Sequence, residues 1–353
     1  MAHQSLYRAY RPQSFTEVAG QEQVTKPLEE AVASGKVGHA YLFAGSRGLG
    51  KTTVARILAR EVGCTEHDLY EIDAASNNSV EDMRTLTEGV YTLPFESPYK
   101  VYILDEVHML SKSAWNAFLK TLEEPPAHAI FILATTELDR VPETVQSRCQ
   151  VFEFKKPTRK GLAEVVRKVA EDLKYKLEPD ARELIATLAD ASYRDALSIL
   201  QKVLASRPLD KEPKDVDGFV LLGRDVIAEV TGAPKRELVH GLLKGLSDGD
   251  RSVSLAAVGH ATGEAIDMQI FLELVIESLR YILLLRYAPE LRPSIEDEMG
   301  HETTRLAEYA DEKNSKITHS TLLAFLTASE RIRYAPIPAL PLELAILELF
   351  PDA

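Results

Sequence analysis

The segment GSRGLGKT, residues 45–52, constrains the fold of this chain more than any other feature. It fits the phosphate-binding pattern G-x-x-x-x-G-K-[ST] without a mismatch. It follows the apolar run AYLFA and precedes the helical pattern TVARILAREV, which is the strand–loop–helix order that the pattern requires. Glycines let backbone N–H groups wrap around phosphate oxygens, and the helix start adds its positive dipole end. A glycine turn with an incidental lysine is the alternative, which the intact context disfavours.

This loop is expected to bind ATP together with Mg²⁺. Lys51 should reach the β- and γ-phosphates, and the Thr52 hydroxyl should bind Mg²⁺. The residues expected to bind the nucleotide here are Gly45, Ser46, Gly48, Leu49, Gly50, Lys51, Thr52 and Thr53.

A second apolar run, VYIL, ends in two adjacent carboxylates, Asp105 and Glu106. Ligands of open α/β sheets bind at the carboxyl ends of the strands, where this pair should lie. We expect Asp105 to hold Mg²⁺, directly or through water, and Glu106 to orient and activate the attacking water. An acidic pair after a strand is weak evidence alone, but beside a P-loop it favours hydrolysis over passive nucleotide storage.

The organisation of the chain changes near Pro157. Before it, short apolar runs alternate with helical patterns, which predicts a parallel sheet flanked by helices and buried on both faces. Afterwards only helical spacing recurs. The expected strands are residues 40–44, 69–72, 101–104, 130–134 and 151–154. The expected domains are an α/β P-loop domain at 1–156, a small helical lid at 157–206, a linker at 207–220 and an all-α domain at 221–353.

Charge and composition exclude several classes of protein. The formal net charge of −13 argues against tight DNA binding by the chain alone, so any such contact should be local, shared with partners or dependent on assembly. The two cysteines lie far apart, which fits a reducing cytoplasm and argues against a disulfide framework. The most apolar stretch, residues 269–286, is too charged to span a bilayer and should be a buried helix. We expect a cytoplasmic protein without membrane contact.

Several further segments resemble the bacterial DNA polymerase III gamma/tau subunits, the AAA+ ATPases of the clamp loader. The resemblance is dense to about residue 205 and looser afterwards. It is carried by YRAYRPQSFTEVAGQEQV, IDAASNNSVEDMR, LDEVHMLSKSAWNAFLKTLEEPP, ILATTELDRVPETVQSRCQVFEF and ASYRDALSILQKV, with RIRYAPIPALPLELAILEL near the end.

The resemblance implies an AAA+ domain, a helical lid and an all-α collar that holds five subunits in an open ring. It implies a motor that hydrolyses ATP at subunit interfaces, opens the sliding clamp and loads it on primed DNA. The implied partners are delta- and delta-prime-type subunits, other copies of this chain, the sliding clamp and primer–template DNA.

Site residues follow from the same resemblance. Tyr10, Arg11, Pro12 and Val18 match the segment around adenine. Thr136 matches the first sensor, which bonds the γ-phosphate or the attacking water, and Arg194 matches the second sensor on the lid, with Ser192 as a helix N-cap. Arg148 matches the arginine finger that acts in trans on ATP of the adjacent subunit. The alternatives are a surface salt bridge for Arg148, a surface charge for Arg194 and a strand-end residue for Thr136.

The chain departs from the family pattern where members of the family usually carry a four-cysteine zinc module. Cys64 matches the first of four cysteine ligands, but the other three are absent. A structural zinc site needs four ligands, and Cys64 and His67 supply at most two. We therefore predict no zinc.

Candidate DNA contacts are also implied by the resemblance. They are Asn77, Asn78, Ser79, Arg84, Ser111 and Lys112. Asn and Ser release no counterion on binding phosphate, so the electrostatic affinity of one subunit should be modest. The alternative is that these residues simply start helices, with Ser79 as an N-cap before acidic first-turn residues. Trp115 is expected to be a core or interface anchor rather than a base-stacking platform.

Two other functions compete with the motor. One is a nucleotide-binding but catalytically silent clamp-loader scaffold, against which the intact Lys51, Thr52, Asp105 and Glu106 argue. The other is a different AAA+ DNA motor such as a branch-migration helicase. Threading of DNA without clamp interaction would support this alternative.

Overall fold

The computed structural model describes residues 4–264, 266–299 and 302–350. The chain forms two compact units, the first comprising Met1–Val165 with Ala189–Ser198 and the second Val166–Leu188 with Ile199–Ala353. Residues 157–206 are thus shared between the units, and the predicted three-domain division stays a prediction.

The first unit is built on a five-stranded parallel sheet in the order β2-β3-β4-β1-β5. Each of the five predicted strands is found within one residue of its expected limits. The strands are β1 (Ala40–Ala44), β2 (Leu69–Asp73), β3 (Lys100–Asp105), β4 (Ala129–Thr135) and β5 (Gln150–Glu153).

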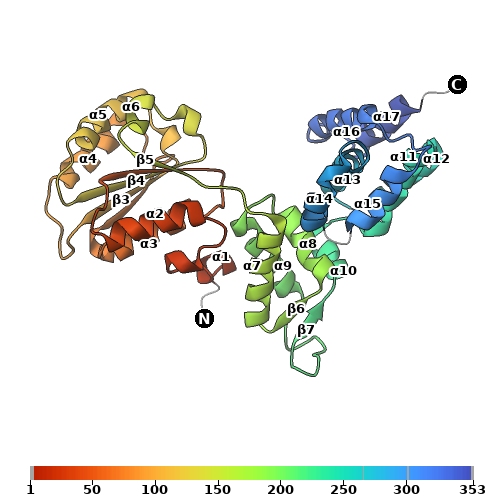
Figure 1. Cartoon of the computed structure of the whole chain (residues 1–353), viewed down its shortest axis with the longest axis horizontal. Helices are drawn as coiled ribbons and strands as arrows, with labels where there is room; N and C mark the ends of the chain where they lie inside the picture. The colour runs from red at the N-terminus through yellow and green to blue at the C-terminus, as the bar shows by residue number, and fades with distance from the viewer. Residues whose placement is uncertain (1–3, 265, 300–301, 351–353) are drawn as a thin grey trace. The chain divides into compact units, whose positions relative to one another are not determined.

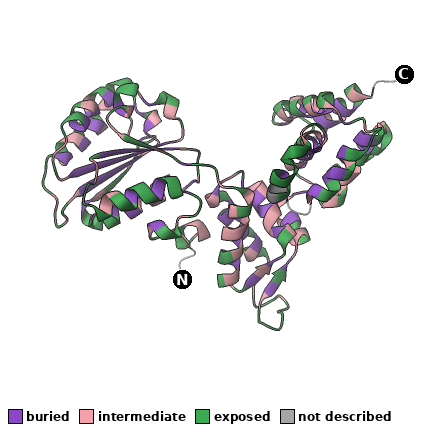
Figure 2. Ribbon diagram, in the orientation of Figure 1, coloured by how far each residue is buried: buried purple, intermediate pink, exposed green. Residues whose placement is uncertain are grey.

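Burial differs between the centre and the edges of this sheet. The central strands β1, β3 and β4 are buried almost throughout, as their uninterrupted apolar runs predict (Figure 2). The edge strands β2 and β5 are not, and the prediction of burial on both faces was wrong for them. Tyr70 on β2 and Val151 on β5 are exposed, because an edge strand lacks a neighbour on one side.

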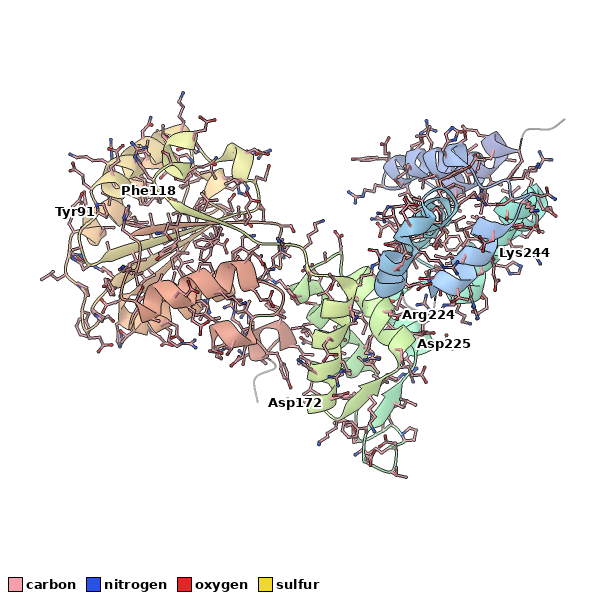
Figure 3. The ribbon with its side chains drawn as sticks, in the orientation of Figure 1. Tyr91, Phe118, Asp172, Arg224, Asp225 and Lys244 are labelled. Atoms are coloured by element: carbon pink, nitrogen blue, oxygen red, sulfur yellow. The ribbon has the colours of Figure 1, made fainter. Side chains whose placement is uncertain are left out.

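Helices cover both faces of the sheet and form two separate cores (Figure 1). On one face, α2 (Glu22–Ala33) and α3 (Lys51–Glu61) pack against residues such as Phe43. On the other face lie α4 (Val80–Val90) and α5 (Lys112–Glu123). Phe118 of α5 is labelled in Figure 3. Its ring meets that of Phe131 of β4 edge to face, with the ring centroids 5.2 Å apart. Trp115 is 4% exposed in the same core, so it is a core anchor.

A buried carboxylate ties down the segment between α4 and β3. Asp68 is 1% exposed and accepts hydrogen bonds from the backbone N–H groups of Phe95, Glu96 and Ser97. Burial alone would raise the pKa of Asp68, but these donors stabilise the charged form and lower the pKa to about 2. The chain between α3 and β2, where the resemblance places a zinc module, is thus anchored through a carboxylate.

The second unit has α13 (Met268–Tyr287) at its core, packed against α11, α12, α15 and α16. The predicted buried helix is therefore found, and no described helix is long and apolar enough to cross a membrane. One of its charges, Arg286, donates to the carbonyl oxygens of Tyr309, Ala310 and Ile317, which explains how a guanidinium is tolerated there.

The prediction of helices only after Pro157 was wrong for two short segments. These are β6 (Tyr175–Leu177) and β7 (Val220–Leu222), which pair in parallel. Three residues are too few to display a strand period in the sequence.

The remaining elements are mostly helical. They are α1 (Leu6–Ala9), α6 (Glu143–Gln146), α7 (Arg159–Asp172), α8 (Pro179–Leu188), α9 (Tyr193–Ser206), α10 (Arg224–Thr231), α11 (Arg236–Asp248), α12 (Arg251–Gly263), α14 (Arg292–Met299), α15 (Glu302–Asp311), α16 (His319–Ile332), α17 (Leu340–Leu349) and the 3₁₀ turns η1 (Phe15–Glu17), η2 (Glu66–Asp68), η3 (Val107–Met109), η4 (Leu138–Arg140) and η5 (Pro289–Leu291).

Candidate nucleotide-binding site

The loop of residues 45–50 joins β1 to α3 and depends on glycine at two positions. Gly48 has φ +80°, and a Cβ there would lie 2.0 Å from Oγ of Ser192, so no larger residue fits without displacement. Gly50, with φ +96°, is the residue before α3. Left-handed backbone at these positions suits glycine and leaves the loop N–H groups and the start of α3 at the same edge of the sheet.

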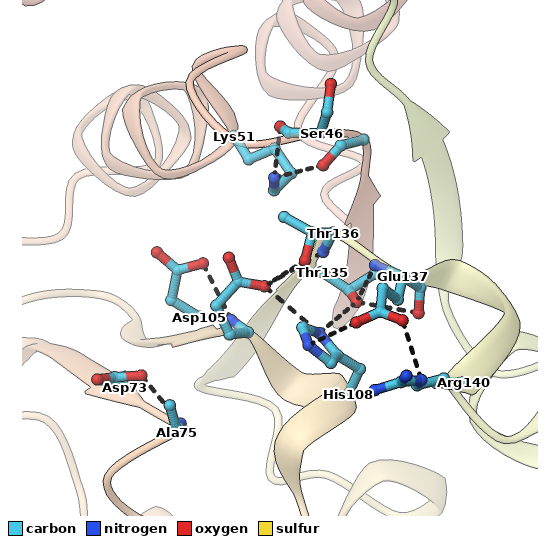
Figure 4. Close-up of polar contacts among 12 residues, drawn as sticks. Ser46, Lys51, Asp73, Ala75, Asp105, His108, Thr135, Thr136, Glu137 and Arg140 are labelled. Atoms are coloured by element: carbon cyan, nitrogen blue, oxygen red, sulfur yellow. Dashed lines mark hydrogen bonds and ion pairs between the residues drawn. The ribbon is translucent and has the colours of Figure 1, made fainter. Parts of the chain in front are cut away.

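Lys51 is held by the loop itself. Its Nζ donates to the carbonyl oxygens of Gly45, at 2.5 Å, and Ser46, at 3.0 Å (Figure 4). The residue is 6% exposed. Burial lowers the pKa of Lys51, while the carboxylates of Glu106 and Asp105 counteract that shift. Among the residues that the structure describes, no carboxylate is hydrogen-bonded to this ammonium, which is therefore available to a phosphate.

The two predicted magnesium ligands are already in contact. Thr52 Oγ1 donates to Asp105 Oδ2 at 2.9 Å, and the N–H of Glu106 donates to Asp105 Oδ1 at 3.0 Å. Mg²⁺ prefers oxygen ligands and is commonly held by one or two protein groups together with substrate phosphates. A hydroxyl and a carboxylate at hydrogen-bond distance fit this requirement.

Glu106 and Thr136 are hydrogen-bonded to one another. Oε2 of Glu106 accepts from the Thr136 hydroxyl at 2.9 Å and from the Thr136 N–H at 3.2 Å. The backbone of Glu106 is left-handed, with φ 52°, which is a strained conformation for a non-glycine residue and one that gathers at functional sites. The structure thus brings the predicted water-activating residue and the predicted first sensor together from two neighbouring strands.

His108 joins the same group, although the sequence analysis did not include it. Its Nδ1 lies 3.3 Å from Glu106 Oε2 and 3.1 Å from Thr135 Oγ1. Its Nε2 lies 3.4 Å from Glu137 Oε1. The sequence feature that could have identified His108 is its place in the DEVHML segment, two positions after the catalytic candidate Glu106.

The predicted adenine segment is tied to the P-loop helix and to the core. Arg11 Nε donates to Thr53 Oγ1 at 3.1 Å, and burial lowers the pKa of Arg11. Tyr10 and Pro12 flank Arg11, while Val18 packs against the core of the α2–α3 face. Gln21 is fully buried and bonds both the N–H and the carbonyl oxygen of Lys155, so the segment is fixed to the end of β5.

Arg194 lies in the first turn of α9 and contacts Tyr7. Its guanidinium carbon is 4.7 Å from the centroid of the Tyr7 ring, and Nη2 is 3.5 Å from the phenol oxygen. The hydrogen bond from Arg194 is the main cause that lowers the pKa of Tyr7 to about 8. The predicted N-cap Ser192 is confirmed, because its Oγ accepts from the N–H of Asp195 at 3.2 Å.

Arg148 makes its contacts on the surface rather than at the P-loop of its own chain. It follows α6, donates to the Thr144 carbonyl at 2.5 Å and forms an ion pair with Glu123 at the end of α5. Its side chain is 35% exposed. The alternative of a surface salt bridge therefore describes this residue in a single chain.

The candidate DNA contacts lie at the starts of α4 and α5. Ser79 is a confirmed N-cap in a capping box with Asp82, and Ser111 caps α5 by accepting from Ala114 N–H. The N–H of Ser111 donates to the Asn78 carbonyl at 3.2 Å, so the two helix starts are neighbours. Asn77 is bonded to Asp73, whereas Arg84 and Lys112 are exposed.

No metal cluster was found in the described part of the chain, meaning no group of three or more His, Cys, Asp or Glu side chains placed to hold an ion. Cys64 Sγ lies 3.4 Å from the Thr65 carbonyl, and burial raises the pKa of the Cys64 thiol. His67 stacks edge-on against Phe95. The absence of zinc stays a prediction.

Comparison with known proteins relates both parts of the chain to DNA polymerase III. The family model of the DNA polymerase III delta subunit matches residues 20–79 and 66–158, and that of gamma and tau domain III matches residues 222–352. The chain is 36% identical to DNA polymerase III subunit tau of Bacillus subtilis, over 99% of this chain and 63% of that protein. It is 30% identical to subunit gamma of Buchnera aphidicola subsp. Schizaphis graminum, over 99% of this chain and 98% of that protein.

Among solved structures, the RuvB Holliday junction branch migration motor of Thermotoga maritima is similar, with a TM-score of 0.52 and 25% identity over 67% of this chain and 79% of that chain. The sheet, the P-loop and the acidic strand end define an AAA+ P-loop protein with a helical C-terminal region. With the relatives above, the chain belongs to the DNA polymerase III gamma/tau subunit family. It spans 55–63% of the length of the first three tau relatives.

Proposed function

We propose that this chain is an ATP-driven motor subunit of the bacterial DNA polymerase III clamp loader. It binds and hydrolyses ATP at subunit interfaces, which opens the sliding clamp and loads it on primed DNA. The observation that carries the proposal is the contact of Thr52 with Asp105 and of Glu106 with Thr136 beside a buried Lys51, in a chain of this family.

The phosphate cradle binds the triphosphate and a metal. Lys51 exchanges the carbonyls of Gly45 and Ser46 for β- and γ-phosphate oxygens, which satisfy an ammonium better than neutral carbonyls do. Thr52 and Asp105 would hold Mg²⁺, which when bound neutralises charge on the phosphoryl oxygens. Tyr10, Arg11, Pro12 and Val18 surround adenine.

Glu106 and Thr136 act on the attacking water. Both donors of Thr136 are directed to Glu106 in this structure. When Thr136 donates instead to the γ-phosphate or to the attacking water, Glu106 loses these two hydrogen bonds. Its carboxylate can then orient and activate the attacking water. Proton transfer by a positioned group contributes roughly 10²–10⁴-fold to a rate.

Two arginines complete the site. Arg194 serves the nucleotide of its own chain, and Arg148 acts on the ATP of the adjacent subunit. Arg148 must first leave Glu123, which costs little, because exposed ion pairs stabilise by only about 0–1 kcal/mol.

The partners are delta- and delta-prime-type subunits, other copies of this chain, the clamp and primer–template DNA, in the cytoplasm. The neighbouring starts of α4 and α5 suit phosphate, because helix N-termini attract anions. Asn77, Asn78, Ser79, Arg84, Ser111 and Lys112 are the proposed DNA contacts. Zinc is not part of the proposal, since the sequence lacks three of the four cysteines that the resemblance places in a zinc module.

The competing functions are a catalytically silent scaffold and a branch-migration helicase. The structural similarity to RuvB is the observation that favours the helicase as an alternative. The test is steady-state ATP hydrolysis by the chain assembled with delta-type subunits and a sliding clamp, with and without primed DNA. The motor predicts hydrolysis stimulated by clamp and primed DNA. Persistent absence of hydrolysis supports the scaffold, and DNA threading under ATP without clamp binding supports the helicase.

A further inference from the structure

Besides the sensor Thr136, His108 lies beside the Glu106 carboxylate. Its Oε2 contacts both donors of Thr136 and, at 3.3 Å, Nδ1 of His108 (Figure 4). When Thr136 turns to a phosphate or to water, the His108 contact remains. The mechanism proposed above therefore needs something to hold Glu106 at that moment, and His108 is in place to do so.

His108 is itself firmly oriented. Its side chain is 7% exposed on the turn η3, and its Nδ1 lies 3.1 Å from the hydroxyl of the fully buried Thr135. That hydroxyl lies 3.2 Å from the Glu137 carbonyl, to which it donates, so its oxygen accepts from His108. In that arrangement Nδ1 carries the proton that it donates to Thr135, and the same nitrogen lies 3.3 Å from Oε2 of Glu106.

The opposite ring nitrogen lies near a second carboxylate. Nε2 of His108 lies 3.4 Å from Glu137 Oε1, and Glu137 pairs with Arg140 at 2.9 Å. The imidazole is thus fixed between two carboxylates on different elements, which leaves it little freedom to follow a moving side chain. A rigid donor is what a mobile catalytic carboxylate requires.

We propose that His108 is a positioning residue for ATP hydrolysis. Through Nδ1, which lies 3.3 Å from Oε2, it holds the Glu106 carboxylate in the place from which the water is activated, once Thr136 has been recruited by the nucleotide. This inference rests on the proposed ATPase function and adds a positioning residue to its site.

Three substitutions separate the two ring nitrogens. The amide nitrogen of Asn can replace Nδ1 and that of Gln can replace Nε2, while Ala replaces neither. His108→Asn should keep kcat within about threefold of the wild type, whereas His108→Gln and His108→Ala should lower kcat roughly 10- to 100-fold, the loss expected for a misplaced catalytic group. Nucleotide affinity should stay unchanged in all three, because His108 does not contact the P-loop residues.

The measurement uses the chain assembled with delta-type subunits, clamp and primed DNA. It records kcat and KM for ATP, the affinity of a fluorescent non-hydrolysable ATP analogue, and the thermal unfolding midpoint. Glu106→Gln gives the reference for loss of the catalytic carboxylate.

The outcomes are distinct. Rescue by Asn but not by Gln supports the proposal. Rescue by Gln but not by Asn assigns the effect to the Glu137 contact and overturns it, as does a fall in affinity or unfolding midpoint that accounts for the lost activity. Full kcat in all three variants overturns this inference alone, whereas a wild-type assembly without ATPase overturns the proposed function as well.

Discussion

The phosphate-binding residues of the site already contact one another within a single chain, whereas the two arginines of the site, Arg148 and Arg194, contact other groups. Lys51 and Thr52 already contact the P-loop carbonyls and Asp105, so the phosphate-binding part is formed from residues of a single unit. Arg148 is bonded to Glu123 and Thr144 on the surface, and Arg194 to Tyr7. If they act on a nucleotide as proposed, we expect both arginines to exchange these partners.

The difference has a physical basis. A charged group inside a preformed loop is costly to leave without partners, so the loop supplies them in advance. An exposed guanidinium can change partners at little cost, because water and weak ion pairs compete almost equally. Such a residue is suited to report whether a neighbouring subunit and its nucleotide are present.

The largest expected effect comes from Arg148. Arg148→Ala should lower ATP hydrolysis by the assembled clamp loader on the order of 10³-fold, because a trans guanidinium no longer neutralises charge on the transferred phosphoryl group. Nucleotide affinity of the mutated chain should remain unchanged, since the P-loop is intact. Steady-state ATPase and fluorescent-nucleotide binding measure the two quantities.

Glu123→Ala is the matched control for Arg148. Removing the carboxylate frees the arginine without deleting it, so hydrolysis should be equal to that of the wild type or slightly faster. A loss of hydrolysis in Glu123→Ala comparable to that in Arg148→Ala would mean that the ion pair itself is needed, and the trans assignment would be wrong.

The next largest effect concerns Lys51. Lys51→Ala should weaken ATP binding by about 10²-fold, the size expected when a buried charge-assisted contact worth roughly 2–3 kcal/mol is lost. Titration of a fluorescent ATP analogue into the single chain measures it. Lys26→Ala, on the exposed face of α2, is the control and should bind as the wild type does. Retained affinity in Lys51→Ala would contradict the assignment of the phosphate site.

The sheet and the phosphate loop could be predicted from sequence because their determinants are local. Buried strands such as β3 and β4 are uninterrupted apolar runs, and a P-loop needs glycine and lysine at fixed spacing. The hydrogen bond between Glu106 and Thr136 was not predicted. The resemblance placed Thr136 at the nucleotide, but neither residue reveals from its own segment that β3 and β4 are neighbours.

Other features had no readable signal. His108 contacts Glu137 across 29 positions of sequence and Tyr7 contacts Arg194 across 187, and single polar residues at such separations carry no periodic pattern. The capping of α4 by Ser79, in contrast, was predictable, because a capping box is complete within four residues.

The smallest expected effect is a change in the pKa of Tyr7, which would show whether Arg194 leaves Tyr7 when a nucleotide binds. The hydrogen bond from Arg194 is the largest of the causes that lower the pKa of Tyr7 to about 8, ahead of the hydrogen bond from Ser5. If a bound nucleotide recruits Arg194, the pKa of Tyr7 should rise towards its ordinary value, and Arg194→Ala should raise it without nucleotide. NMR of labelled tyrosine rings over a pH series measures this, with Tyr7→Phe to assign the signal.

The same shift has a consequence for affinity, whose sign follows from linkage. A Tyr7 that is protonated in the nucleotide-bound chain but ionised in the free chain takes up a proton on binding. Affinity should therefore be greatest below pH about 8 and fall as the pH rises above it. In Tyr7→Phe this component should vanish while the rest of the pH profile persists. If the pKa of Tyr7 is the same with and without nucleotide, Arg194 remains bonded to Tyr7 when the nucleotide binds. Arg194 would then differ from Arg148, because it would not exchange its partner.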